Sequence, residues 1–490
     1  MVNLIVVNNP KDWTFEIPGV ECVSAKAYLT EDCYSRMRMA RVFNFCKSYR
    51  YQSIGYYVSL LAAARGHKPL PSITTIQDLK SQTQMRFVDE DLDELIQKSL
   101  ATIQSESFTL SIYFGKNLAK KYDRLALQLY NLYPAPLLRA TFVKSKEEWH
   151  LRDIDPVSTG EIPVDHHDFL IEVATEHFAG KGVGTIKRKA QPYDLAILWN
   201  PQEAEGPSNE KAIKKFVSAA ESLGFNTEII GRDDFGSIAE FDALFIRETT
   251  SVNHHTYRFA RRAKAEGLVV VDDPESILKC SNKVYLAELL DHYNIPTPKT
   301  CILHKDNPDS VLDEIGVPCV LKQPDSAFSQ GVIRVDTKEQ FETESDRLLS
   351  KSDLVVVQEY TPTEFDWRVG VFDGKPLFVC KYFMARNHWQ IIKRDTEGNK
   401  REGGFETLPV ELAPRQVVRT ALKAAALIGD GLYGVDIKQI GKACYVMEVN
   451  DNPNVDYGIE DLVYKNALYE RIMEVFLKKI INKNGAGFYY

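Results

Sequence analysis

Residues 431–453, GLYGVDIKQIGKACYVMEVNDNP, alternate apolar and polar side chains on either side of a turn that contains Gly441. This pattern predicts an antiparallel hairpin with strands at 433–439 and 443–449. If the loop has three residues centred on Lys442, Asp436 lies directly opposite Glu448. The hairpin therefore requires a sheet in which acidic side chains share one face.

Asn450 is expected on the same face as Glu448, because side chains alternate along a strand. Two carboxylates and an amide oxygen then converge at one end of the sheet. Mg²⁺ (or Mn²⁺) prefers such hard oxygen ligands and binds few of them from the protein. Asp436, Glu448 and Asn450 are thus the predicted metal ligands. An exposed acidic hairpin is the alternative, although apolar neighbours flank both acids.

A chain of 490 residues is too long for one hydrophobic core and predicts roughly three domains. Residues 1–190 mix helical and strand patterns, such as YYVSLLAAARG and FTLSIYF, and predict an α+β domain. The stretch AGKGVGTIKRKAQP that follows is interpreted as a linker. Residues 191–280 alternate strand and helix like a Rossmann layer but lack GxGxxG. Residues 281–485 form the third predicted domain.

Composition excludes several partners and compartments. A net charge of −8 disfavours nucleic acid and anionic membranes, which attract Lys- and Arg-rich proteins. The eight cysteines form no CxxC pair and are expected to be reduced thiols. The N-terminus MVNLIVVNNP lacks a signal pattern, and no apolar run reaches about 18 residues. A cytoplasmic protein is expected, and a homo-oligomer is one option for its assembly.

Two lysines have contexts that suit phosphate. Lys283 follows the helix-start residues Ser281 and Asn282, and Lys322 ends the apolar run PCVL. A lysine ammonium acts as a mobile point charge on phosphate oxygens. An ordinary Lys–Glu pair is the alternative for either lysine alone.

Two further segments are weaker signals. QPDSAFSQGV, with Gly331, is a small-residue loop whose backbone N–H groups suit phosphates. The strand run LVVVQEY ends on Gln358, Glu359 and Tyr360, where backbone groups suit an adenine edge or merely end a strand.

Arginines and a lysine complete the candidate site. Arg368 offers a planar fork for a carboxylate or a transferring phosphoryl group, and Asp366 on the same face is an alternative partner that neutralises it. Arg247 follows the strand run ALFI and could hold a substrate carboxylate. The candidate substrate-side cations in the charged stretch from Lys381 onward are Lys381, Arg386 and His388.

Together these motifs resemble the ATP-grasp superfamily, and its RimK-type ligases in particular. The resemblance spans about residues 193–480, and it is carried by Lys283 in SNKVYLAELLDHYNIPTPKT, Lys322 in VPCVLKQPDSAFSQGV, QEY, DWR, Asp436 and EVNDNP. Residues 1–190 look like the extra domain of some RimK-like proteins. The fold implied is α/β and α+β multidomain, with a C-terminal ATP-grasp domain after a Rossmann-like pre-ATP-grasp domain.

The resemblance implies an ATP-dependent ligase that joins a carboxylate to an amine through an acyl phosphate. The carboxylate would belong to a small molecule, peptide or protein, and the amine to an amino acid. By the same resemblance Lys283 and Lys322 bind ATP phosphates, Glu359 and Tyr360 border adenine, and Arg368 contacts the reacting phosphoryl group. SAFSQG departs from the glycine-rich run usual in this branch. A nucleotide-binding regulatory or scaffold protein without turnover is therefore the alternative.

Overall fold

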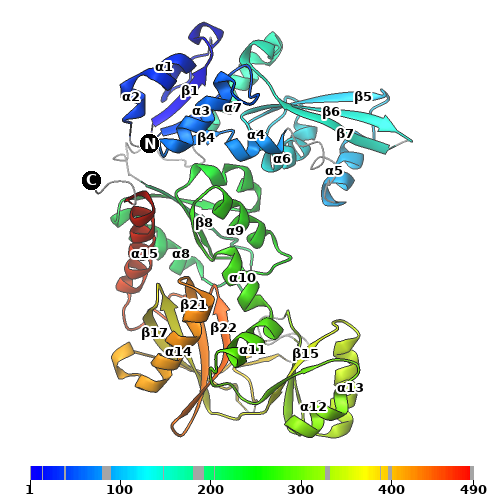
Figure 1. The fold of residues 1–490 in the computed structure, drawn as a ribbon, viewed down its shortest axis with the longest axis vertical. Coiled ribbons are helices and arrows are strands. Elements are labelled where there is room, and N and C mark those ends of the chain that lie inside the picture. The colour runs from blue at the N-terminus through cyan, green and yellow to red at the C-terminus, as the bar shows by residue number, and fades with distance from the viewer. Residues whose placement is uncertain are drawn as a thin grey trace. The chain divides into compact units, whose positions relative to one another are not determined.

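The computed structural model describes residues 2–13, 15–37, 40–79, 90–146, 148–179, 193–203, 205–325, 331–386, 388–394 and 400–485. The chain forms two compact units (Figure 1). The N-terminal unit comprises Met1–Asp194 and Gly231–Phe241, and the C-terminal unit comprises Leu195–Ile230 and Asp242–Tyr490. That residues 231–241 join the N-terminal unit was not predicted. The predicted linker begins at Ala179, which the structure places at the end of a helix, and the rest of it, residues 180–192, lies outside the described residues.

The N-terminal unit contains a parallel sheet in the order β2-β1-β3-β4. Its strands are β1 (Val2–Val7), β2 (Val20–Ser24), β3 (Ala40–Asn44) and β4 (Lys68–Leu70). Leu4 and Val6 of β1 pack with helices α1 (Ala25–Thr30) and α3 (Ile54–Ala64), while Ile5 and Val7 pack with α7 (His167–Ala179). The uninterrupted apolar run of β1 is explained because both faces of the strand are buried.

A second, antiparallel sheet in this unit has the order β5-β6-β7. It consists of β5 (Ser107–Tyr113), β6 (Leu137–Ser145) and β7 (Glu148–Pro156). Helices α5 (Glu90–Leu100) and α6 (Asp123–Leu132) contribute to one apolar core with these strands. The region therefore mixes helices and strands as expected, with one parallel and one antiparallel sheet.

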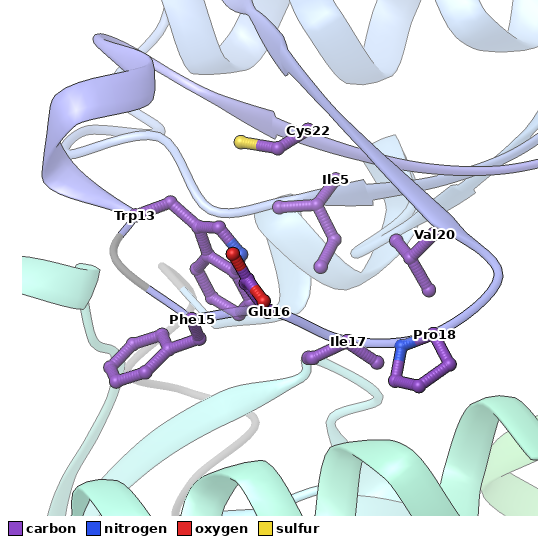
Figure 2. Close-up of a pocket in the computed structure, with 8 residues that line it drawn as sticks. All are labelled: Ile5, Trp13, Phe15, Glu16, Ile17, Pro18, Val20 and Cys22. Carbon is purple, nitrogen blue, oxygen red and sulfur yellow. The ribbon is translucent and has the colours of Figure 1, made fainter.

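A pocket of about 470 Å³ lies beside the parallel sheet (Figure 2). Ile5 and Cys22 come from β1 and β2, and Trp13, Phe15 and Ile17 come from the segment between these strands. The Trp13 ring stacks on Phe45 with centroids 5.2 Å apart. Glu16 is the one charged residue among the described residues that line the pocket, and burial raises the pKa of the Cys22 thiol.

Residues 231–241 are held in the N-terminal unit by polar contacts. The Gly236 backbone N–H donates to Asn131 Oδ1 at 2.9 Å, and a Cβ at Gly236 would lie 2.7 Å from the Tyr130 ring. Glu240, 8% exposed, lies 3.2 Å from Arg41 and 3.4 Å from His177. Burial by itself raises the pKa of Glu240, but the neighbouring basic groups lower it to about 2.

The C-terminal unit begins with a four-stranded sheet in the order β11-β10-β8-β9. Its strands are β8 (Tyr193–Leu198), β9 (Phe225–Ile230), β10 (Ala243–Ile246) and β11 (Val269–Val271). The β10 strand pairs in parallel with β8 and β11. Helices α8 (Glu210–Ser222), α9 (His255–Ala265) and α15 (Asn466–Gly485) belong to the same unit, and a Rossmann-like classification of this layer stays a prediction.

Two antiparallel sheets follow in this unit. The first has the order β12-β15-β13-β14, and the second has the order β20-β17-β16-β21-β22. The strands of the first are β12 (Thr300–Leu303), β13 (Cys319–Lys322), β14 (Val332–Val335) and β15 (Val355–Glu359), with α12 (Pro308–Ile315) and α13 (Lys338–Leu349) against them. The strands of the second are β16 (Phe365–Phe372), β17 (Lys375–Phe383), β20 (Phe405–Leu408), β21 (Leu432–Ile440) and β22 (Ala443–Asp451).

Helix α14 (Arg415–Ile428) packs its small and branched side chains against the apolar face of the second sheet. Helix α10 (Pro274–Ser281) and helix α11 (Lys283–His292) precede the two sheets in sequence. The second sheet therefore has one face buried under α14, and Arg368 and Asp436 lie on the other face.

The predicted hairpin forms, but its turn differs from expectation. Ile440 pairs with Ala443, so the loop has two residues, and a register shift follows between Asp436 and Ile437. Ile437 pairs with Val446 and Asp436 with Glu448, which leaves Met447 as the extra residue of a β-bulge. The expected Asp436–Glu448 pair is confirmed, whereas the three-residue loop was wrong. Without the bulge, Glu448 would share the face of buried Val446.

Candidate active site

The polar face of the second sheet brings three predicted residues together. Arg368 on β16 is opposite Asp436 on β21, which in turn is opposite Glu448 on β22. The Arg368 guanidinium donates to both Asp436 oxygens, with Nη2 2.7 Å from Oδ2. Burial tends to lower the pKa of Arg368, but the pairing with Asp436 raises it overall. Arg368 is therefore a fixed positive charge on this face.

The sheet accommodates the Arg368 side chain because position 434 on β21 has no Cβ. A Cβ at Gly434 would lie 3.0 Å from Arg368 Cδ and 2.7 Å from Pro453 Cβ. Asn450, opposite Gly434, donates from Nδ2 to Asp436 Oδ2 at 3.3 Å. Its amide oxygen is the end of the side chain that could serve a cation.

Lys283 and Lys322 lie next to this acidic pair. Lys283 is the first residue of α11, whose N-terminus is capped by the Asn282 side chain, and its Nζ lies 3.1 Å from Glu448 Oε1. Lys322 ends β13, and its Nζ donates to Gln358 Oε1 at 2.7 Å. Burial lowers the pKa of Lys322 to about 8, and it raises that of Glu448, but Lys283 and Lys322 lower the Glu448 pKa overall.

A narrow pocket of about 30 Å³ connects these residues. Small-molecule pockets usually hold roughly 300–1,000 Å³, so a nucleotide requires this one to widen. Its lining comes from α11, the first sheet and the end of β22, and it includes Lys283, Thr300, Lys322, Gln358 and Glu448. Lys283 and Lys322, the two lysines predicted to bind phosphate, thus line the same pocket as Glu448, a predicted metal ligand.

The donor set fits magnesium. Asp436 and Glu448 are paired carboxylates, with 14% and 32% of their side chains exposed, and Asn450 adds an amide. Two acids plus phosphate and water oxygens are the usual environment of Mg²⁺ in nucleotide sites. No cluster of three or more His, Cys, Asp or Glu side chains suited to a metal occurs among the described residues.

Two family models match the sequence. A model described as "RimK-like ATPgrasp N-terminal domain" matches residues 25–173, and a "RimK-like ATP-grasp domain" matches residues 280–468. Together they cover more than half of the chain. The chain belongs to the RimK-like ATP-grasp family. The predicted family, the mixed α/β class and the ATP-grasp ligase type are confirmed.

Curated relatives of this RimK-like chain include two named "Probable alpha-L-glutamate ligase". The protein from Marinomonas sp. is 25% identical over 52% of the chain and 87% of its own length. "Probable alpha-L-glutamate ligase 1" from Shewanella denitrificans is 28% identical over 55% of the chain and 94% of its own length. A solved D-alanine–D-alanine ligase from Bacillus anthracis aligns over 60% of the chain and 99% of its own, with 17% identity and a TM-score of 0.47.

The residues of the RimK-like chain that are predicted to border adenine lie at the end of β15 and directly after it. Gln358 is 5% exposed and donates from Nε2 to Thr300 Oγ1 at 2.9 Å, so its side chain bridges Lys322 and β12. Glu359 has an exposed side chain, and its backbone N–H donates to Lys299 O. The Tyr360 ring lies under the Arg334 guanidinium at 4.2 Å. Only Gln358 of the three predicted residues lines the narrow pocket.

The predicted phosphate loop is described only at its base. Gly331 has φ +69° and accepts from the Gln323 N–H at 2.9 Å, which closes the two ends of the loop. Residues 326–330, SAFSQ, lie outside the described residues.

Arg247 is not available to a substrate carboxylate in this structure. It is 0% exposed, and its guanidinium donates to Ser208 Oγ at 3.0 Å, Asn452 Oδ1 at 2.7 Å and Pro453 O at 2.9 Å. The expectation placed Arg247 in the substrate site because it follows a parallel strand. The structure instead uses it to fix the turn that follows the Glu448–Asn450 strand end.

Lys381 lies on the other face of β17 from the predicted phosphoryl site. It is opposite Trp367, lies 5.4 Å from that ring, and pairs with Glu406 at 2.7 Å. Arg386 is exposed, and His388 contacts Gln390 at 3.2 Å. The structure therefore does not gather these predicted substrate cations into one group.

Three polar residues near the site were missed. Lys438, two residues after Asp436 on β21, pairs with Asp366 at 2.6 Å, so Asp366 does not neutralise Arg368 as the alternative held. Tyr382 on β17 donates its hydroxyl to Glu460, which is 1% exposed. Alternation along β21 could have indicated Lys438, whereas Glu460 lies in a turn region without periodicity.

The described residues contain no helix apolar and long enough to span a bilayer.

Proposed function

We propose that this protein is an ATP-dependent ligase that joins a carboxylate to the amine of an amino acid through an acyl phosphate. One observation carries the proposal: Arg368, Asp436 and Glu448 stand side by side on the polar sheet face, with Lys283 on Glu448 and Lys322 in the same pocket. Basic side chains placed beside acidic ones in this way suit a triphosphate with bound magnesium, because the bases face phosphate oxygens and the acids face the metal ion.

Each side chain has a role in this proposal. Lys283 and Lys322 neutralise phosphate oxygens, and Gln358, Glu359 and Tyr360 border the adenine at the strand end. Arg368 faces the transferring phosphoryl group, where its planar fork stabilises developing charge. Asp436, Glu448 and Asn450 would hold Mg²⁺ (or Mn²⁺), which when bound neutralises charge on the phosphates. Gly331 would let the backbone near the base of the loop approach the phosphates.

The chemistry divides into two displacements. A substrate carboxylate oxygen attacks the γ-phosphorus of ATP, and the bond from that phosphorus to the β-phosphate oxygen breaks to release ADP. An amine nitrogen then attacks the acyl carbon and loses a proton, and inorganic phosphate leaves. Positioning and electrostatics supply most of the rate, because the residues named need form no covalent bond.

The relatives named as probable alpha-L-glutamate ligases support glutamate as the first amine to test. Among the three cations predicted on the substrate side, Arg386 is the exposed one and stays the candidate for a substrate carboxylate. The acceptor carboxylate is proposed to belong to a small molecule, a peptide or a protein.

The test is a screen for ADP release with ATP, Mg²⁺, L-glutamate and a panel of amino-acid, peptide and protein carboxylates, followed by mass analysis of the product. A ligase releases ADP only when acid and amine are both present. Asp436→Asn and Glu448→Gln should lower turnover by roughly 10²–10³-fold or more. Glu406→Gln is the matched control, because it removes the acid of another Lys–Glu pair on the same sheet, at 2.7 Å from Lys381.

Full turnover in the Asp436 and Glu448 variants would refute the site. Tight ATP binding without ADP release for any acid and amine would instead favour the regulatory or scaffold alternative.

A further inference from the structure

Arg368 is supported from two neighbouring strands. On β21 its guanidinium forms a two-pronged pair with Asp436, and on β17 its Cζ lies 5.6 Å from the centroid of the Tyr382 ring. A guanidinium over an aromatic face within about 6 Å is attracted by the ring. Two different kinds of contact therefore hold the same side chain.

The two supports differ in what else they must do. Asp436 already accepts a hydrogen bond from Asn450 at 3.3 Å, and under the proposed function it also serves the metal ion. The same two oxygens would then be divided between an arginine and a metal. The Tyr382 ring has no place in the proposed metal or phosphate site, so its contact with Arg368 does not compete with either.

Tyr382 is itself fixed at its far end. Its hydroxyl donates to Glu460 Oε1, and the other oxygen of Glu460 accepts the Asp456 backbone N–H at 2.7 Å. Glu460 is 1% exposed, so this carboxylate is held inside the protein by two donors. Because the Tyr382 ring is already fixed at its hydroxyl, it loses little further conformational entropy when the Arg368 guanidinium packs against it.

We propose that Tyr382 and Glu460 are positioning residues that hold Arg368 toward the γ-phosphate independently of Asp436. The inference rests on the proposed function, which places Arg368 at the transferring phosphoryl group. Because Arg368 would contact the γ-phosphate and not the β-phosphate, the support should matter for a triphosphate and not for a diphosphate.

The test compares the dissociation constants of Mg–AMPPNP and Mg–ADP in the full-length protein by calorimetry. Tyr382→Phe keeps the ring and removes its anchor, and it should weaken Mg–AMPPNP about threefold with Mg–ADP unchanged. Tyr382→Leu removes the ring as well and should weaken Mg–AMPPNP about tenfold, within the range of exposed to desolvated cation–π contacts. Arg368→Lys should weaken it by at least as much.

The chain offers a closely matched control. Tyr469 is 1% exposed and donates its hydroxyl to Asp461 at 3.1 Å, and Asp461 also accepts a backbone N–H, from Gly458 at 2.7 Å. The Tyr469 ring packs on Phe216, 4.8 Å between centroids, rather than on an arginine. Tyr469→Phe thus removes an equivalent buried hydrogen bond and should leave the affinity ratio of the two nucleotides unchanged.

A double-variant cycle separates the possible failures. If Tyr382 acts through Arg368, Tyr382→Phe should change the ratio little once Arg368→Lys is present. Additive effects, or equal loss for both nucleotides, would overturn the support and leave the proposed function intact. An unchanged ratio in Arg368→Lys would remove Arg368 from the γ-phosphate and overturn both.

Discussion

Buried charges in the two units are satisfied in contrasting ways. In the N-terminal unit, Glu240 is enclosed with Arg41 and His177, and its backbone oxygen accepts from Lys68 at 3.0 Å. In the C-terminal unit, the polar sheet face carries separate pairs, Arg368 with Asp436 and Lys283 with Glu448. The first arrangement holds one segment of chain to its neighbours. The second places the Lys283–Glu448 pair on the wall of a pocket, where a ligand can replace either partner.

The contrast indicates how to distinguish structural charges from functional ones. An acid surrounded by several protein cations leaves no group for a ligand, and its loss should affect folding. An acid that pairs with one cation beside a pocket leaves that cation able to exchange the acid for a ligand. Loss of such an acid should affect binding and catalysis. Lys322 fits the second pattern, because it donates to the neutral Gln358 amide although burial makes its charge costly.

The largest effect on stability is expected for Glu240→Gln. The change removes the buried carboxylate that faces Arg41 and His177, and it should destabilise the N-terminal unit by about 3 kcal/mol, at the low end of what breaking a buried ion pair costs. Hydrogen exchange measured by mass spectrometry should show lost protection at residues 231–241, β3 and β4. Turnover per folded molecule should be unchanged.

Glu176→Gln is the control in the same unit, because its pair with Lys116 is about half exposed on both sides. It should change stability by no more than about 1 kcal/mol. If Glu240→Gln had as little effect as Glu176→Gln, the enclosed charges would not be what holds residues 231–241.

A smaller effect, on catalysis rather than stability, is expected for Gly434→Ala. The added Cβ would meet Arg368 Cδ at 3.0 Å and Pro453 Cβ at 2.7 Å, so the guanidinium must shift away from its pairing with Asp436. A displacement near 1 Å in a positioning group costs roughly 10²-fold in rate. The turnover number for ADP release, measured with the substrate pair found in the screen, should fall by about that factor.

Gly160→Ala supplies the comparison from the N-terminal unit, since a Cβ there meets no atom within 4 Å. Its turnover should match that of the unchanged protein. Near-normal turnover in Gly434→Ala would mean that the position of Arg368 against β21 is not needed for catalysis.

The hairpin shows both what the sequence could predict and where it stopped. Alternation identified the face that Asp436, Glu448 and Asn450 share, because a period of two is a local property of each strand. The turn was predicted with the wrong length, and the pairing was still right because the bulge at Met447 adds the missing residue to the strand instead of the loop. A bulge restores the register without leaving a distinct composition in the sequence.

The side-chain pairs between neighbouring strands could not be predicted from the sequence. Asp366 and Arg368 were correctly placed on one face, yet each pairs with a residue of β21, Lys438 and Asp436 respectively. The sheet pairs β16 with β21, a strand from a distant part of the chain, and periodicity within one strand contains no information on that pairing. Burial of Arg247 was missed for the same reason, because its partners at 452–453 are more than 200 residues away.

The smallest effect concerns the pH dependence of stability, through Glu460. Burial raises the pKa of this carboxyl from 4.5 to about 7. Between these values the folded protein keeps a proton that the unfolded chain has released, so stability declines as pH rises through the interval. The contribution is fully present below about pH 4.5 and is lost above about pH 7. Glu460→Gln cannot ionise, so its stability relative to the unchanged protein should improve by roughly 2 kcal/mol between pH 5 and pH 8.

Urea unfolding at a series of pH values measures this difference, and the slope matters more than the offset. Gln also loses one of the two acceptors for the Tyr382 hydroxyl and the Asp456 N–H, which shifts the curve by a constant amount at every pH. The ionisation of Glu460 changes only the slope. Parallel curves would show that Glu460 is already ionised near its ordinary pKa in the folded protein.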